Sequence, residues 1–286
     1  QGMVCHETYK STSGNWLLPE QVKKTESGAL VDSVSGEAVT LGRVEKMSKS
    51  KKNVVDPRHI IESYGADTAR LFMMSDSPPE RDLEWTDAGI DGAWRYVNKL
   101  WRLLYEHLDA IQSAGDPASV TSGKALEIRK KTHQTIEAVT QDIEAFHYNK
   151  MVAHIRELSN LLGSIDTSDK QNAAAFREGI EVLIHLIAPL TPHLAEAMWQ
   201  TLGHDDLVAL RAWPETDSSL LVNDVITIAV QVNGKVRATM DVSPGASREE
   251  LEKAALEQPN VIRALEEKSV RKVITVPGKI VNVVAA

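Results

Sequence analysis

Four lysines lie within seven positions of one short segment, Lys46-Met47-Ser48-Lys49-Ser50-Lys51-Lys52. Ammonium groups this close repel one another unless an anion lies among them. A loop that carries them can close over a polyphosphate and stabilise the charge that develops as a phosphoanhydride bond breaks. The same residues would also suit a solvated basic turn or a localisation patch, and composition alone does not separate these interpretations.

The single cysteine, Cys5, lies beside His6 without further partners at metal-ligand spacing. One cysteine forms no internal disulfide and supplies no zinc knuckle, which fits a reducing cytoplasmic setting. The longest apolar runs, such as Leu183 to Leu190, are too short to span a bilayer. We therefore expect a cytoplasmic protein with no metal site in this chain and no membrane partner.

The formal net charge of the 286-residue chain is -8. A protein that coats nucleic acid indiscriminately needs a broadly positive surface, so any contact with RNA must be local. Residues 223 to 286 hold nine Lys and Arg against eight Asp and Glu, which makes this end the least acidic part. The basic loop and this terminal region are thus the two places suited to phosphate.

The segment before the lysine loop, residues 9 to 44, consists of brief apolar pieces separated by glycine-containing turns. This pattern predicts small β-hairpins. The turns are Ser13-Gly14-Asn15, Ser27-Gly28 and Ser35-Gly36. After the loop, Asp56-Pro57 predicts an N-cap and first helical residue, with Ile60, Ile61 and Tyr64 on one face until Gly65, and Asp67 to Met74 predicts a second helix.

The middle of the chain shows the three- and four-residue apolar spacing of amphipathic helices. Thr86 opens the longest stripe, Ile90, Trp94, Val97, Leu100, Trp101, Leu104, Leu108 and Ile111. Three more stripes follow: Ile128, Ile136, Val139 and Ile143; Val152, Ile155, Leu158 and Leu162; and Phe176, Ile180, Leu183, Ile184 and Ile187. With a further helix after Thr191-Pro192, they predict an antiparallel bundle in which Trp94, Trp101 and Trp199 are core residues. Trp16 and Trp85 lie in less regular segments, where contact with RNA is an alternative to packing.

From about residue 223 the pattern becomes that of strands. Val225 to Val232 and Lys235 to Val242 alternate around Asn233-Gly234, which predicts a hairpin. Ser247 and Glu250 have capping-box spacing, and Val270 to Val276 and Lys279 to Val284 predict two more strands. Five basic residues on or beside these strands would lie along one edge as phosphate contacts, or be ordinary solvated charge: Lys235, Arg237, Arg271, Lys272 and Lys279.

The letters KMSKS at Lys46 to Ser50 match the second signature of class I aminoacyl-tRNA synthetases. Two later blocks resemble the stem-contact segment and the anticodon-binding domain of the leucine, isoleucine and valine enzymes: Asp56-Pro57 with Tyr64 to Leu71, and Leu190 to Glu196 with Trp199. Further segments resemble bacterial leucyl-tRNA synthetases: Gly2-Met3-Val4, the turn-rich insert, Leu83-Glu84-Trp85, Val230 to Arg237 and Val276-Pro277-Gly278-Lys279. The cysteine-rich or coiled-coil ends of the isoleucine and valine enzymes are absent from the sequence.

The resemblance implies a multidomain, mainly α-helical fold. Residues 1–55 would be the end of a Rossmann-type catalytic domain with the small β-rich insert at 9–44, and 56–85 the stem-contact segment. Residues 86–222 would form the anticodon-binding antiparallel helical bundle, and 223–286 a small C-terminal α/β domain that binds tRNA. A linker near Pro214 to Asn223 would join the last two.

The resemblance also implies a reaction, in which leucine and ATP form leucyl-adenylate and leucine is then transferred to tRNA(Leu). Lys46 and Lys49 would be catalytic, and Lys46, Met47, Ser48, Lys49 and Ser50 would bind the phosphates of ATP. Lys51, Lys52 and Arg70 would contact tRNA, together with the five basic residues of the terminal domain. Mg²⁺ is expected with ATP in the full enzyme, which would act as a monomer.

One feature of the family is missing, since no His-x-Gly-His sequence of the HIGH type occurs. The abrupt start at Gln1 suggests an excised C-terminal segment, so we expect this chain alone not to activate leucine. Two alternatives remain open: a non-catalytic module that docks tRNA, and the equivalent part of an isoleucine- or valine-type synthetase.

Overall fold

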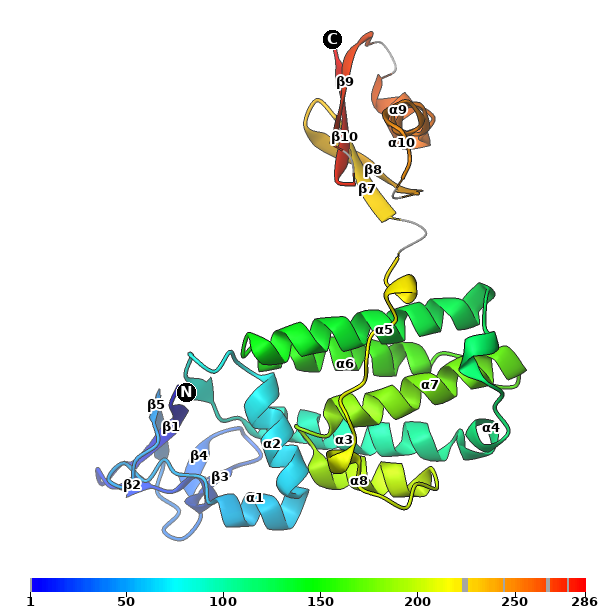
Figure 1. Cartoon of the computed structure of the whole chain (residues 1–286). Coiled ribbons are helices and arrows are strands. Elements are labelled where there is room, and N and C mark those ends of the chain that lie inside the picture. Colours follow the sequence, from blue (N-terminus) through cyan, green and yellow to red (C-terminus); the bar gives the residue numbers. More distant parts are fainter. Residues whose placement is uncertain (1, 223–225, 244, 266–267, 277) are drawn as a thin grey trace. The chain divides into compact units, whose positions relative to one another are not determined.

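The computed structural model describes residues 2–222, 226–243, 245–265, 268–276 and 278–286. The chain divides into two compact units, Gln1–Asp217 and Ser218–Ala286 (Figure 1). Three positions used in the sequence predictions, Asn223, Val225 and Pro277, lie outside the described residues. No helix in the described ranges is long and apolar enough to cross a membrane.

The first unit begins with a small mixed sheet. Its central strand β1 (Val4–Ser11) pairs antiparallel with β2 (Trp16–Leu17) and β5 (Val39–Lys46), and parallel with β6 (Leu83–Glu84). A 3₁₀ turn (Pro19–Gln21) precedes a separate hairpin of β3 (Val22–Lys24) and β4 (Leu30–Asp32). The predicted turns are confirmed by positive φ at Gly14, Gly28 and Gly36, a conformation that costs glycine little.

Two helices follow the lysine loop, as the sequence predicts. Helix α1 (Pro57–Tyr64) starts where the Asp56 side chain accepts a hydrogen bond from the Arg58 N–H, and it ends at Gly65, whose φ is 85°. Helix α2 covers Ala66–Ser75. The predicted apolar face of α1 is only partly correct, because Ile60 is buried whereas Ile61 is half exposed.

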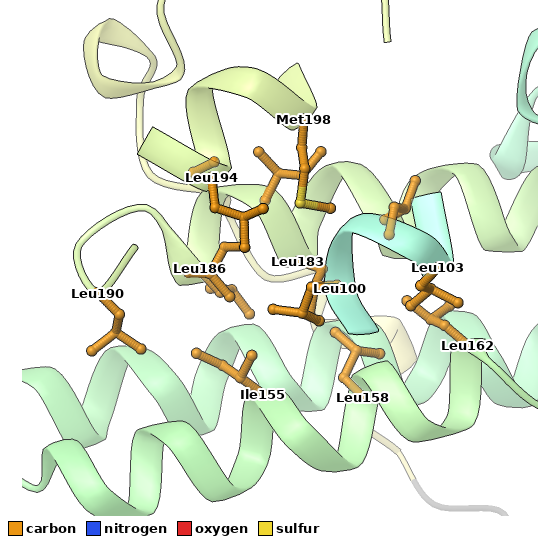
Figure 2. Close-up of a cluster of buried hydrophobic side chains, with 14 of the residues drawn as sticks. Leu100, Leu103, Ile155, Leu158, Leu162, Leu183, Leu186, Leu190, Leu194 and Met198 are labelled. Carbon is orange, nitrogen blue, oxygen red and sulfur yellow. The ribbon is translucent and has the colours of Figure 1, made fainter. Parts of the chain in front are cut away.

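In the described residues six more helices complete the first unit, with a 3₁₀ turn at Pro117–Ser119 between two of them and another at Val208–Leu210 after the last. They are α3 (Asp87–Tyr105), α4 (Leu108–Gln112), α5 (Gly123–Glu144), α6 (Tyr148–Leu162), α7 (Lys170–Ile187) and α8 (Pro192–Thr201). Helix α5 packs on both α6 and α7. Figure 2 shows the leucine-rich centre of this bundle, where Leu158, Leu162 and Leu183 are fully buried.

The tryptophans of the bundle behave differently from one another. Trp199 is 5% exposed, which confirms its predicted place in the core. Trp94 and Trp101 are 45% and 38% exposed, so their predicted core role is wrong. Helix α3 instead buries Ala93 and Tyr96, which lie on the neighbouring side of its apolar stripe.

The second unit is a four-stranded sheet with two helices, after a 3₁₀ turn at Ser218–Leu220. Its elements are β7 (Ile226–Val232), β8 (Lys235–Val242), α9 (Arg248–Leu256), α10 (Pro259–Leu265), β9 (Val270–Val276) and β10 (Ile280–Ala285), and the strand order is β8-β7-β10-β9. The predicted Asn233-Gly234 hairpin is confirmed, with φ of 50° and 79°, and so is the Ser247 to Glu250 capping box. Apolar residues of both helices and the two central strands form a separate core.

Candidate functional site

The lysine loop connects the end of β5 to the start of α1. Lys46, Lys49 and Lys52 are exposed, so their ammonium groups are free to meet an anion. Lys51 is half-buried and forms an ion pair with Glu45 on β5. The structure therefore brings three of the four predicted lysines to solvent on one loop and uses the fourth within the fold.

The tip of the loop is a compact turn. The Lys52 N–H donates to the Lys49 carbonyl at 3.3 Å, and the Lys51 N–H donates to the Ser48 hydroxyl at 3.3 Å. The hydroxyls of Ser48 and Ser50 are 3.4 Å apart. Lys52 has a φ of 55°, a left-handed conformation that costs a side-chain-bearing residue free energy and reverses the chain.

The base of the loop is held by two side chains, one half-buried and one fully buried. Met47 is half-buried and packs against the apolar core, next to a cavity of about 260 Å³. The amide of Asn53 is fully buried among backbone groups of β1, β5 and the loop. Sequence reasoning missed Asn53, although an asparagine directly after a run of lysines was a visible signal. The cavity is lined by Val4, Met47, Val55, Pro57, Ile60, Ile61, Ala69, Met73 and Trp85.

Trp85, offered as a possible RNA contact, instead packs edge-on against Phe72 with ring centroids 5.1 Å apart, and it is 8% exposed. Trp16 lies partly exposed on β2, where Lys10 sits over its ring at 5.2 Å. Both side chains are less exposed than those of Trp94 and Trp101. The exposed tryptophans are therefore Trp94 and Trp101, which periodicity assigned to the core.

Helix α2 and the start of α8 are joined by hydrogen bonds. The Asp67 carboxylate accepts from the Leu194 N–H at 2.7 Å and lies 2.9 Å from His193 Nδ1. Arg70 donates to the carbonyls of Pro189 at 2.7 Å and Leu190 at 3.2 Å. The guanidinium of Arg70, predicted to meet tRNA, is thus engaged in joining two sequence blocks more than a hundred residues apart.

A second polar cluster lies between α5 and α7. Arg129 donates to Glu178 from Nε at 2.7 Å and from a terminal nitrogen at 3.0 Å, and His133 Nε2 lies 3.3 Å from the same carboxylate. Burial raises the pKa of Glu178, but the hydrogen bonds from His133 and Arg129 outweigh burial, so the pKa is lowered overall. His133 Nδ1 accepts the Asp217 N–H at 3.0 Å, which fixes the end of the first unit to the bundle.

The five basic residues singled out in the second unit are exposed. They do not gather along one edge of the sheet, where they were predicted to lie. Lys235 and Arg237 belong to β8, whereas Arg271 and Lys272 belong to β9, and these strands form opposite edges of the sheet. The separation follows from the strand order, which alternation along a sequence does not reveal. Lys279 lies in the exposed turn before β10.

An open groove of about 380 Å³ lies where Arg237 on β8 approaches α10. Asn260 and Arg263 of α10 also line it. Two guanidinium groups and an amide suit a phosphate oxygen better than an apolar ligand. Arg263 was not singled out from the sequence, because on its own it is one charge on a short helix.

No group of three or more His, Cys, Asp or Glu side chains in the described ranges could hold a metal ion. Carboxylates and water are the ligands that Mg²⁺ prefers. The described residues therefore show no cluster that would hold Mg²⁺ without further ligands, such as the phosphates of a nucleotide.

Known proteins match the chain along its length. The family described as "tRNA synthetases class I (I, L, M and V)" matches residues 37–86, which include the lysine loop, and the "Anticodon-binding domain of tRNA ligase" matches residues 125–253. The leucine–tRNA ligase of Paramagnetospirillum magneticum is 55% identical over 99% of this chain, and that of Rhodospirillum centenum is 51% identical over 99%. The chain spans about a third of the length of these curated relatives, 33% and 34%.

A solved structure is similar as well. It is the ternary complex of the Agrobacterium radiobacter K84 agnB2 LeuRS with tRNA and LeuAMS, with a TM-score of 0.73 and 28% identity over 85% of this chain and 31% of that chain. The leucine enzymes are thus favoured over the isoleucine and valine enzymes that shared the loop and the stem-contact block. By its sequence and its fold, the chain belongs to the class I aminoacyl-tRNA synthetases, in the leucine–tRNA ligase family.

Proposed function

We propose that this chain is the C-terminal part of a leucine–tRNA ligase and supplies the lysine loop of its ATP site. The observation that carries the proposal is the loop itself. Lys46 and Lys49 extend into solvent from a loop anchored at its base, inside the region that matches the class I synthetases. The rest of the active site would come from parts of the ligase outside this chain.

In the proposed reaction the leucine carboxylate attacks the α-phosphorus of ATP. The bond from that phosphorus to the bridging oxygen breaks, and pyrophosphate leaves with the bonding electrons. The ammonium groups of Lys46 and Lys49, with backbone N–H groups near Ser48, would stabilise the charge on the leaving phosphates. A second step would transfer leucine from the adenylate to the terminal adenosine of tRNA(Leu).

The test is Lys49→Ala in the complete ligase that contains this chain. Leucine-dependent ATP–pyrophosphate exchange should fall about a hundredfold to a thousandfold, as is typical when one charge-stabilising donor is removed. Filter binding of tRNA(Leu) should stay within about twofold. Lys23→Ala on β3 is a matched control, since that lysine is also exposed but lies off the loop. Unchanged exchange in Lys49→Ala would refute the role of the loop.

We propose tRNA(Leu) as the macromolecular partner, bound by the second unit and the bundle. Support comes from the exposed basic residues of β8 and β9 and from the LeuRS–tRNA complex that the fold resembles. Lys52 and Lys279 would add phosphate contacts, whereas Lys51 would first need to leave Glu45 and Arg70 its carbonyl partners. Affinity should fall as salt rises, because phosphate contacts release counterions.

The finer layout is part of the same proposal: residues 1–55 as the end of the catalytic domain, 56–85 as the stem-contact segment, 86–222 as the anticodon-binding bundle and 223–286 as the tRNA-binding domain. A cytoplasmic monomer is the proposed working form. The alternative function is a non-catalytic module that docks tRNA, which the separately folded second unit favours. It predicts that this chain retains tRNA(Leu) on a filter while Lys49→Ala in the ligase leaves exchange unaltered.

A further inference from the structure

The lysine loop needs a fixed base if its ammonium groups are to meet the same phosphates in every catalytic cycle. Its tip is held by bonds among partly exposed groups, such as that from the Lys51 N–H to the Ser48 hydroxyl. Bonds of this kind exchange readily with water and contribute little order. The base, where β5 ends and the loop begins, must therefore supply the order.

Asn53 lies at this base with no exposed surface. Its Nδ2 donates to the carbonyls of His6 at 3.1 Å and Glu45 at 3.0 Å, with the Lys46 carbonyl at 3.4 Å. Its Oδ1 accepts the Ser48 N–H at 2.9 Å. One side chain thus joins strand β1, the end of strand β5 and the first turn of the loop.

The chemistry of this site requires an amide. The carbonyl groups need a donor and the Ser48 N–H needs an acceptor, and asparagine presents both from one short side chain. A carboxylate would place an oxygen against the carbonyls of His6 and Glu45. An alanine would leave the same backbone groups buried without partners, which is unfavourable in a dry environment.

The backbone groups that bond to Asn53 lie beside the two lysines assigned to ATP. The Glu45 and Lys46 carbonyls flank Lys46, and the Ser48 N–H directly precedes Lys49. Lys52, in its left-handed conformation, turns the chain inward so that Asn53 reaches these groups. The side chain therefore holds the backbone at Lys46 and at Ser48, the residue before Lys49.

We propose that Asn53 is a positioning residue for the activation step, and that it orients Lys46 and Lys49 through the backbone of the loop. The proposal rests on the proposed function of those lysines. Asn53 itself touches no substrate. Its loss should misplace the ammonium groups, and a displacement of about 1 Å of a catalytic group can cost about a hundredfold in rate.

The test uses Asn53→Asp and Asn53→Ala in the complete ligase. The kcat of ATP–pyrophosphate exchange should fall about tenfold to a hundredfold, while the KM for leucine stays within about twofold, because the loop lysines are assigned to the phosphates of ATP. Trypsin should cleave within the loop faster than in the unaltered protein, a readout independent of activity. If Asn53→Asp does not melt cooperatively, Asn53→Ala, which adds no charge, carries the test.

Ser159→Ala is the matched control. Ser159 is also fully buried, and its hydroxyl lies 3.0 Å from that of Tyr96 in the bundle. This variant should leave the kcat and the trypsin cleavage of the loop unchanged. A folded Asn53 variant with kcat within twofold of the unaltered ligase would overturn the proposal, as would an equal loss in Ser159→Ala. Lys49→Ala, run in parallel, separates the two ideas: if it leaves exchange intact, the proposed function itself fails.

Discussion

Replacing Asp67 with alanine should destabilise the first unit by disconnecting α2 from α8. Thr191 occupies the N-cap of α8 but makes no capping bond with its side chain. Asp67, 127 residues before Leu194, accepts the Leu194 N–H instead and so caps the helix from outside. The carboxylate is 10% exposed, which limits how far water can replace it.

The magnitude follows from what the carboxylate does. Loss of a helix cap costs about 1 kcal/mol, and a charged hydrogen bond contributes about 1.5 to 3 kcal/mol. A negative charge at a partly buried helix N-terminus contributes up to about 2 kcal/mol. These values describe overlapping parts of one interaction, so we expect about 2 to 3 kcal/mol in total. His193 adds little because its side chain is 79% exposed.

Thermal unfolding followed by tryptophan fluorescence is the assay. All six tryptophans precede residue 218, so the signal reports the first unit alone. At about 2 to 4 °C per kcal/mol for a domain of this size, Asp67→Ala should lower Tm by about 5 to 10 °C. Asp67→Asn keeps an acceptor for the Leu194 N–H and should lose less than half as much. A shift below about 1 °C for Asp67→Ala would refute the capping role.

Three further predictions concern the bundle. Because the pKa of Glu178 is lowered in the fold, its stabilising effect is present above the unfolded value of about 4.3 and is lost as pH falls through the folded pKa. Glu178→Gln should therefore weaken the acid dependence of tryptophan-monitored stability, and an unchanged pH profile would contradict this. Leu158→Ala should cost about 2 to 5 kcal/mol in urea denaturation, since the side chain is fully buried. Gly179→Ala should cost about 1 to 3 kcal/mol by the same measurement, because the added Cβ would lie 2.7 Å from Leu162 Cδ2; equal stability would show that Leu162 can move aside.

The features of the fold that are set by residues close together in the sequence could be predicted. The caps at Asp56 and Thr86, the Asn233-Gly234 hairpin and the Ser247 capping box all depend on residues within one turn. Periodicity also found the bundle helices. Periodicity assigned Trp94 and Trp101 to the core because it counts large aromatic residues as hydrophobic even at the border of an apolar stripe. In the structure these two are exposed, and the buried side of the helix holds smaller residues such as Ala93.

Only the part of the candidate site formed by residues close together in the sequence could be predicted. The lysines of the loop lie within seven positions of the sequence, and the resemblance to the synthetases implies a role for them. The partners that hold the loop and the helices are distant, as with Asn53 and His6, 47 positions apart, or Asp67 and Leu194, 127 positions apart. Spacing along a sequence carries no information on such pairs, so the positioning residues emerged only from the folded chain.

The central claim is that the lysine loop acts when leucine is activated. Rapid quench under single-turnover conditions separates leucyl-adenylate formation from transfer to tRNA(Leu) in the complete ligase. In Lys49→Ala we expect adenylate formation to slow about a hundredfold or more, while transfer from preformed adenylate keeps its unaltered rate. Equal slowing of both steps, or an unchanged rate of adenylate formation, would contradict the account.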